Sequence, residues 1–92
     1  MSRRKPVNQM SLKLESRSVN ESFARVAVSA FAAQQDPTVE EISDIKTAVS
    51  EAVTNCIVHA FPESVGEIYI WVGLIVDGLV RLRIRDRGCG IA

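Results

Sequence analysis

Two alternating stretches meet at Asp77-Gly78, and together they constrain the fold more than any other feature of the sequence. Residues 67 to 76 read "EIYIWVGLIV", and residues 79 to 86 read "LVRLRIRD". An Asp-Gly pair between two such stretches is a strong signal of a two-residue β-hairpin. The sequence therefore predicts two adjacent antiparallel strands in this half of the chain.

The two predicted strands differ in their outward faces. In the first strand, one face is formed by Ile68, Ile70, Val72, Leu74 and Val76. Its other face is also unusually apolar and comprises Tyr69, Trp71, Gly73 and Ile75. In the return strand, Val80, Leu82 and Ile84 point one way, and Arg81, Arg83 and Arg85 point the other. A sheet with one apolar and one cationic face needs helices on the apolar side alone.

The first half of the chain predicts a strand followed by two helices. Residues 10 to 15, "MSLKLE", alternate as a half-buried strand does, and residues 1 to 9 are expected to be a flexible extension outside the fold. A capping box at "SVNE", with Ser18 and Glu21, predicts a helix that ends before Pro37. The apolar positions of this helix include Phe23, Val26, Ala27, Ala30 and Phe31.

A second capping box, Thr38 with Glu41, opens the longer helix, which should run from Val39 to Phe61 and stop at Pro62. The element order is then β-α-α-β-β. We expect an α+β fold, a two-layer α/β sandwich, formed by one domain over residues 10 to 92.

Composition narrows the classes of function. Lys+Arg and Asp+Glu are 11 each, so a formal net charge of zero offers no support for a nucleic-acid or membrane-surface role driven by bulk charge. The 2 cysteines, Cys56 and Cys89, form neither a disulfide framework nor a zinc motif. Cys56 falls on an apolar helical face, where a buried thiol is expected, and a reduced cytoplasm fits best.

The long helix carries a polar line on the side opposite its apolar stripe. In "SEAVTNCIVHA", residues 50 to 60, Glu51, Asn55 and His59 are four residues apart and should face away from the sheet. The apolar stripe comprises Ile42, Ile45, Val49, Val53, Cys56 and Ala60. A solvated polar face would explain the line equally well, since acids and amides are common on exposed surfaces.

The second polar feature is "RDRGCG", residues 85 to 90. Asp86 shares the parity of the inner-facing residues of its strand, and a buried acid is costly unless something hydrogen-bonds to it. Gly88 and Gly90 follow, and two closely spaced glycines allow backbone to approach a ligand. An ordinary strand-ending turn with a solvated Asp is the alternative, but a helix bearing E-x-x-x-N before a hairpin ending in D-x-G-x-G is a specific combination.

In this combination "SEAVTNCIVHAF" resembles the N-box and "RDRGCGI" the first glycine box of the GHKL superfamily of histidine kinase-like ATP-binding domains. Within that superfamily, "NESFARVAVSAF" and "DPTVEEISDIKTAVSEAVTN" are most similar to the anti-sigma F factor family of spore-forming bacteria, whose members are also serine kinases. The resemblance extends from Met10 to Ile91 and implies the Bergerat-type ATP-binding fold.

The resemblance implies a role for each matching residue. Asn55 would ligate the Mg²⁺ that bridges the phosphates of ATP or ADP, and Glu51 would be the general base for the attacking hydroxyl. Asp86 would accept a hydrogen bond from the adenine amino group. Gly88 and Gly90 would let the backbone lie against the nucleotide. These roles suit the residue types, because Mg²⁺ takes oxygen ligands and phosphoryl transfer depends mainly on positioning and charge neutralisation.

The resemblance also implies the partners. They would be a sporulation sigma factor and an anti-anti-sigma protein, on which a serine is phosphorylated, and the chain would form a homodimer. Arg25, in "SFARV", is a candidate partner contact by the same resemblance, with a solvated helix charge as the alternative. Neither direct nucleic-acid binding nor a membrane association is expected.

The sequence departs from the family pattern at its C-terminus. The family domain continues past the first glycine box into a lid and a second glycine-rich box, whereas this sequence stops at Ala92, where a Pro is expected. We therefore expect a truncated chain that binds ATP weakly and does not transfer phosphate at a useful rate. A non-catalytic partner-binding fragment and an ATPase domain of another GHKL branch are the alternative interpretations.

Overall fold

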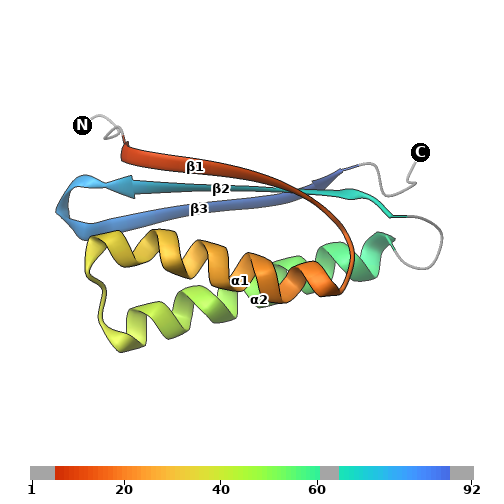
Figure 1. Ribbon diagram of the computed structural model, residues 1–92, viewed down its shortest axis with the longest axis horizontal. Coiled ribbons are helices and arrows are strands. Elements are labelled where there is room, and N and C mark those ends of the chain that lie inside the picture. Colours follow the sequence, from red (N-terminus) through yellow and green to blue (C-terminus); the bar gives the residue numbers. More distant parts are fainter. Residues whose placement is uncertain (1–5, 61–64, 88–92) are drawn as a thin grey trace.

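The computed structural model describes residues 6–60 and 65–87, and it forms two layers (Figure 1). The chain order is β1 (Pro6–Glu15), α1 (Val19–Ala32), η1 (Ala33–Gln35), α2 (Val39–Ala60), β2 (Glu67–Ile75), η2 (Val76–Gly78) and β3 (Leu79–Arg87). Both long helices lie on one side of the sheet, as the single apolar sheet face requires (Figure 1). The predicted α+β sandwich and its order, β-α-α-β-β, are confirmed. No helix among the described residues is both long and apolar enough to cross a membrane.

The sheet is antiparallel throughout, with the strand order β1-β2-β3. Leu12 on β1 lies opposite Ile70 on β2, which in turn lies opposite Ile84 on β3. The alternation in all three strands therefore brings their apolar residues to the same face. Against this face pack the buried residues of the helices, and the core comprises Ala24, Val28, Val49, Val53, Cys56, Ile68, Ile70 and Val72. The expected burial of the Cys56 thiol is confirmed.

Strand β1 begins at Pro6, four residues before the strand that the sequence predicts. Residues 6 to 9, expected to belong to a flexible extension, pair with the far end of β2 instead. Gln9 accepts a 2.8 Å hydrogen bond from the indole Nε1 of Trp71. Strand β2 is nine residues long, so its backbone also offers hydrogen-bond partners to the residues that precede Met10. This pairing makes residues 6 to 9 part of β1, although their sequence does not alternate.

Helix α1 buries a stripe of small residues. Ala24, Val28 and Ala32 are spaced by four and are completely buried. Phe23 and Val26, two of the apolar positions noted from sequence, are 52% and 60% exposed. Small side chains let a helix pack closely on a sheet. Ala24, Val28 and Ala32 therefore face the sheet, and the larger Phe23 lies outside the core.

The two helix starts differ, although both have the sequence of a capping box. At α2, Thr38 Oγ1 accepts a 3.0 Å bond from Glu41 N, and Glu41 Oε1 accepts a 2.8 Å bond from Thr38 N. At α1, Ser18 has helical backbone angles and makes no side-chain cap, so the predicted capping box is wrong there. A cap residue normally needs an extended backbone to aim its oxygen at the first turn.

The hairpin turn occupies three residues, Val76–Gly78, because Ile75 pairs directly with Leu79. Asp77 and Gly78 have φ angles of 79° and 82°, the left-handed backbone that an Asp-Gly pair tolerates best. Val76, expected on the inner face, is in the turn and is 50% exposed, whereas Ile75, expected on the outer face, is buried. A register shift between Pro6 and Asn8 lies opposite this end of β2 and breaks the regular alternation there.

Candidate functional site

Helix α2 separates its apolar and polar residues as predicted. Val49, Val53 and Cys56 are buried against the sheet and α1. Glu51 and Asn55 are exposed on another face of the helix. The polar line is therefore displayed on a helix whose position is fixed by its buried stripe.

A shallow cavity lies along this exposed line. It has a volume of about 350 Å³ and is lined by Ser50, Glu51, Thr54 and Asn55. These positions follow the helical repeat, so two adjacent turns of α2 form the cavity wall. All four side chains present oxygen atoms, which can accept hydrogen bonds or bind a hard cation.

The side chains of Glu51 and Asn55 make no hydrogen bond or ion pair within the described part of the chain. The Glu51 carboxylate and the Asn55 amide are thus available to an external group. A carboxylate can accept a proton from a hydroxyl, and an amide oxygen can bind a cation without adding charge. The line can therefore bind a metal–phosphate group on one turn and hold a base on the next.

Ser50 connects the cavity to helix α1. Arg25 Nη1 donates a 3.1 Å hydrogen bond to Ser50 Oγ and a 3.0 Å bond to Glu21 Oε2. Arg25 is half-buried between the helices, so it is neither a free surface charge nor a fully buried one. This guanidinium holds the cavity wall in register with α1.

Asp86 lies on β3 directly opposite Ile68 of β2 and is half-buried. Because Ile68 is completely buried, Asp86 lies on the helix-covered side of the sheet, as its parity predicts. Helix α2 and strand β3 end at the same end of the molecule (Figure 1), so Asp86 and the last turns of α2 share that end. Gly88 and Gly90 lie outside the described residues, as does the side chain of His59.

The donors present are compatible with Mg²⁺ that is held mainly by a ligand's phosphates. No group of three or more His, Cys, Asp or Glu side chains that could hold a metal occurs among the residues described. One amide and one carboxylate on α2 cannot complete an octahedral shell, but Mg²⁺ in phosphate sites usually takes one or two protein ligands. The donor set therefore fits a nucleotide-bound cation better than a permanent metal centre.

Sequence reasoning missed two members of this site, Ser50 and Thr54. Their positions beside Glu51 and Asn55 in the helical repeat were the available signal. The link from Arg25 to Ser50 had no such signal, because it depends on how α1 packs on α2.

Comparison with known proteins yields one family match. Residues 13–92 match the histidine kinase-like ATPase domain. This range includes the α2 line and Asp86, along with the stretch that contains Gly88 and Gly90.

Curated proteins provide closer similarities. The chain is 58% identical over 84 residues to an anti-sigma F factor of Caldanaerobacter subterraneus subsp. tengcongensis, covering 91% of this chain and 58% of that protein. It is 53% identical over 85 residues to the anti-sigma F factor of Geobacillus thermodenitrificans, covering 92% and 58%. For the anti-sigma F factor of Priestia megaterium the identity is 55% over 85 residues, covering 91% and 58%. The chain thus spans less than two thirds of the length of these relatives.

Proposed function

The chain belongs to the histidine kinase-like ATPase domain family, and on this premise we propose that it is part of an anti-sigma factor with a nucleotide site on α2. The observation that carries the proposal is the cavity lined by Glu51 and Asn55, whose polar groups have no partner within the described residues. The names of the relatives above support the regulatory part of the proposal. A sigma factor is accordingly the proposed binding partner.

In the proposed nucleotide site, each residue has one task. Asn55 binds the Mg²⁺ of Mg²⁺-ATP or Mg²⁺-ADP through its amide oxygen, and this cation neutralises phosphate charge when bound. Asp86 accepts a hydrogen bond from the adenine amino group. Its half-buried position on the helix-covered side of the sheet supports this place beside the base. The backbone at Gly88 and Gly90 lies against the nucleotide.

The proposed reaction is transfer of the γ-phosphoryl group of ATP to a serine hydroxyl of an anti-anti-sigma protein, with ADP as the leaving group. Glu51 is the general base, which accepts the proton of the attacking hydroxyl. One helical turn separates Glu51 from Asn55, so the base would lie beside the residue that would hold the cation. Phosphoryl transfer depends mostly on this positioning. We place the chain in the cytoplasm as a homodimer, where sigma factor and substrate would both meet it.

Arg25 is the proposed partner contact on α1. Its guanidinium has five donors, and bonds to Glu21, Ser50 and Ser22 leave two further N–H groups for a partner. A guanidinium already held in place loses less conformational freedom on binding than a free one. The same contacts allow a purely structural role, in which Arg25 only joins the two helices.

Calorimetric titration with Mg²⁺-ADP tests the nucleotide site. The parent chain should bind, and Asn55→Ala should weaken binding by about tenfold or more, equivalent to the loss of about 1.4 kcal/mol. Chelation of Mg²⁺ should weaken the parent far more than Asn55→Ala. Thr47→Ala is the matched control. Thr47 is exposed on α2 about two turns before Asn55, so this variant should bind Mg²⁺-ADP like the parent.

Glu51→Gln distinguishes proton acceptance by Glu51 from nucleotide binding by Asn55. It should leave ADP affinity unchanged and lower the slow phosphorylation of the anti-anti-sigma protein that the parent chain supports by about 10²- to 10⁴-fold. Equal ADP binding by the parent, Asn55→Ala and the chelated sample would overturn the assignment of Asn55. Loss of ADP binding in Glu51→Gln would show that Glu51 binds nucleotide instead of acting as the base.

A partner-binding module without catalysis is the second candidate, favoured by one observation. Val19, Phe23 and Val26 form an exposed apolar line on α1, at 71%, 52% and 60% exposure. Exposed apolar lines of this kind often mark protein-binding surfaces. Sigma-factor binding that is equally tight with and without Mg²⁺-ADP would favour this candidate.

A further inference from the structure

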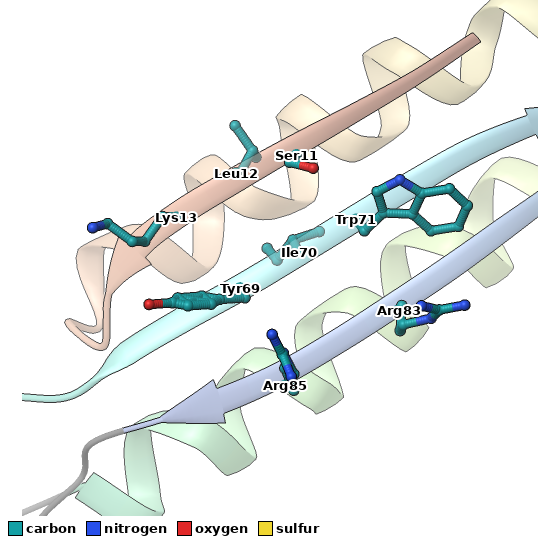
Figure 2. Close-up of a pocket in the computed structure, with 8 residues that line it drawn as sticks. All are labelled: Ser11, Leu12, Lys13, Tyr69, Ile70, Trp71, Arg83 and Arg85. Atoms are coloured by element: carbon teal, nitrogen blue, oxygen red, sulfur yellow. The ribbon is translucent and has the colours of Figure 1, made fainter.

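The face of the sheet opposite the helices carries a groove that the nucleotide site does not use. Figure 2 shows its lining, and its volume is about 600 Å³. The lining residues are Ser11, Leu12, Lys13, Tyr69, Ile70, Trp71, Arg83 and Arg85. We propose that this groove binds an extended acidic peptide segment of a partner protein, through the cations and rings of two cross-strand rows.

The groove is built from these two rows of side chains. Ser11, Trp71 and Arg83 lie opposite one another across the three strands and form the first row. Lys13, Tyr69 and Arg85 are aligned in the same way and form the second row. Cations thus flank both sides of an aromatic centre, with Lys13 from β1 on one side and the two arginines from β3 on the other (Figure 2).

The arginines are held in place by the rings. The Arg83 guanidinium lies over Trp71 with its carbon 5.3 Å from the ring centroid, and that of Arg85 lies over Tyr69 at 5.5 Å. The rings are fixed in turn, since Trp71 donates to Gln9 and Tyr69 donates a 2.6 Å bond to Glu67. A stacked guanidinium still presents its N–H edges to an anion, and its fixed position lowers the entropic cost of binding.

Charge favours an anionic occupant. Lys13, Arg83 and Arg85 are exposed, whereas the two acids of this face, Glu15 and Glu67, lie opposite each other beyond one end of the groove, with Glu67 3.8 Å from Lys13 Nζ. The acids of α2, including Glu40, Glu41 and Asp44, lie in the helical layer on the other side of the sheet. A net charge of zero for the chain therefore conceals a cationic sheet face.

Spacing favours a peptide. Arg83 and Arg85 are two residues apart on one strand, a separation of about 6.8 Å. Carboxylates at alternate positions of an extended peptide have the same separation, so two of them can meet both guanidinium groups. The floor between the rings, formed along Leu12 and Ile70, then lies under the intervening residue.

The arginines that cover the rings of Trp71 and Tyr69 make single-stranded nucleic acid a poor occupant of the groove. Sites for single strands present free aromatic faces on which bases stack. Here each ring is covered by an arginine, and Trp71 also lies against Gly73, where an added Cβ would be 2.4 Å from the indole Cη2 atom. Base stacking would have to displace the arginines that the phosphates would need.

The test uses the fluorescence of Trp71, which is the only tryptophan of the chain. The probe is an acetylated, amidated heptapeptide in which Glu and Ser alternate, and its control has Gln in place of Glu. The Glu peptide should change the Trp71 emission saturably, with an affinity that falls as salt is added, because the cations are exposed. The Gln peptide should bind at least about tenfold more weakly.

Two variants make the test specific. Arg83→Gln with Arg85→Gln should weaken binding of the Glu peptide by about tenfold or more. Arg81→Gln removes the same charge from the same strand but lies opposite Gly73, outside the groove, and should bind like the parent. Circular dichroism of the variants should match the parent, since all three arginines are exposed.

Three outcomes would overturn the proposal. They are no saturable response to the Glu peptide, equal losses in the double variant and in Arg81→Gln, and tighter binding of oligouridylate than of the Glu peptide. The last outcome would assign the groove to nucleic acid. None of these outcomes bears on the proposed Mg²⁺-ADP site, whose residues do not line this groove.

Discussion

Arg25 of α1 and Ser50 of α2 are joined by a 3.1 Å hydrogen bond from Nη1 to Oγ, and Ser50 lines the candidate site. The same Nη1 atom also contacts Glu21, at 3.0 Å. A change at Arg25 therefore affects both the packing of the helices and the wall of the site. Effects of such a change on partner binding must be separated from effects on stability.

A double-mutant cycle on Arg25→Ala and Ser50→Ala measures this link. We expect a coupling of about 0.5–1 kcal/mol in the free energy of unfolding, since the pair is partly exposed and screened by solvent. Urea unfolding of the parent, both single variants and the double variant gives the value. Arg17→Ala is the control, because its pair with Glu15 is exposed and should contribute about 0–0.5 kcal/mol. Strictly additive effects would show that the helices are not joined through this bond.

The two buried serines should respond oppositely to alanine. Ser16 Oγ accepts a 2.7 Å bond from Gly66 N, whereas Ser29 Oγ has no partner within the described residues. Ser16→Ala leaves a buried N–H unpaired and should cost about 1–3 kcal/mol. Ser29→Ala removes an unpaired hydroxyl from a helix and should be neutral or stabilising. Chemical denaturation measures both, and a destabilising Ser29→Ala with a neutral Ser16→Ala would contradict this prediction.

The two helix starts predict a second contrast. Thr38→Ala removes the Oγ1 acceptor of the α2 cap while leaving the backbone N–H that donates to Glu41, and it should cost about 1 kcal/mol. Ser18→Ala removes a side chain that caps nothing and should change stability by less than about 0.5 kcal/mol. Thermal unfolding followed by circular dichroism would reveal the difference. Equal losses in both variants would mean that Ser18 also caps its helix in solution.

Gly73→Ala should displace the indole of Trp71. The new Cβ would lie 2.4 Å from Cη2, so the ring would have to move away from Gln9 and Arg83. We expect a loss of about 1–2 kcal/mol and a shift of the tryptophan emission. In a Trp71→Leu background the added Cβ no longer meets the ring, and the same change should be neutral or stabilising, because alanine suits a strand better than glycine. A loss that persists in that background would place the clash elsewhere.

Periodicity predicted the elements, and tertiary pairing decided their limits. The alternation of β2 and β3 and the capping box at Thr38 each depend on a few neighbouring residues, so the sequence alone was sufficient for them. The start of β1 at Pro6 depends on β2, which follows about 60 residues later. Whether a capping box forms depends on backbone angles, and those of Ser18 are helical. Neither the start of β1 at Pro6 nor the backbone angles of Ser18 can be predicted from a local sequence pattern.

The candidate site divides in the same way. The spacing of Glu51 and Asn55 on one helix was sufficient to predict that they share a face, and the parity of Asp86 gave its side of the sheet. The contact between Arg25 and Ser50 requires two helices to pack, and the rows of the groove require three strands in register. Interactions between elements were therefore the part that sequence could not supply.

The position of β1 at the edge of the sheet also bears on how the protein is made. Among the described residues this first strand pairs only with β2, whose residues emerge from the ribosome about 60 residues later, or about 3–12 s at ordinary rates of synthesis. The hairpin of β2 and β3 closes over three residues, whereas docking of β1 must close a loop that contains both helices. The β1 segment therefore stays unpaired until nearly all the described chain has been synthesised. The first residues to be made are the last to join the sheet.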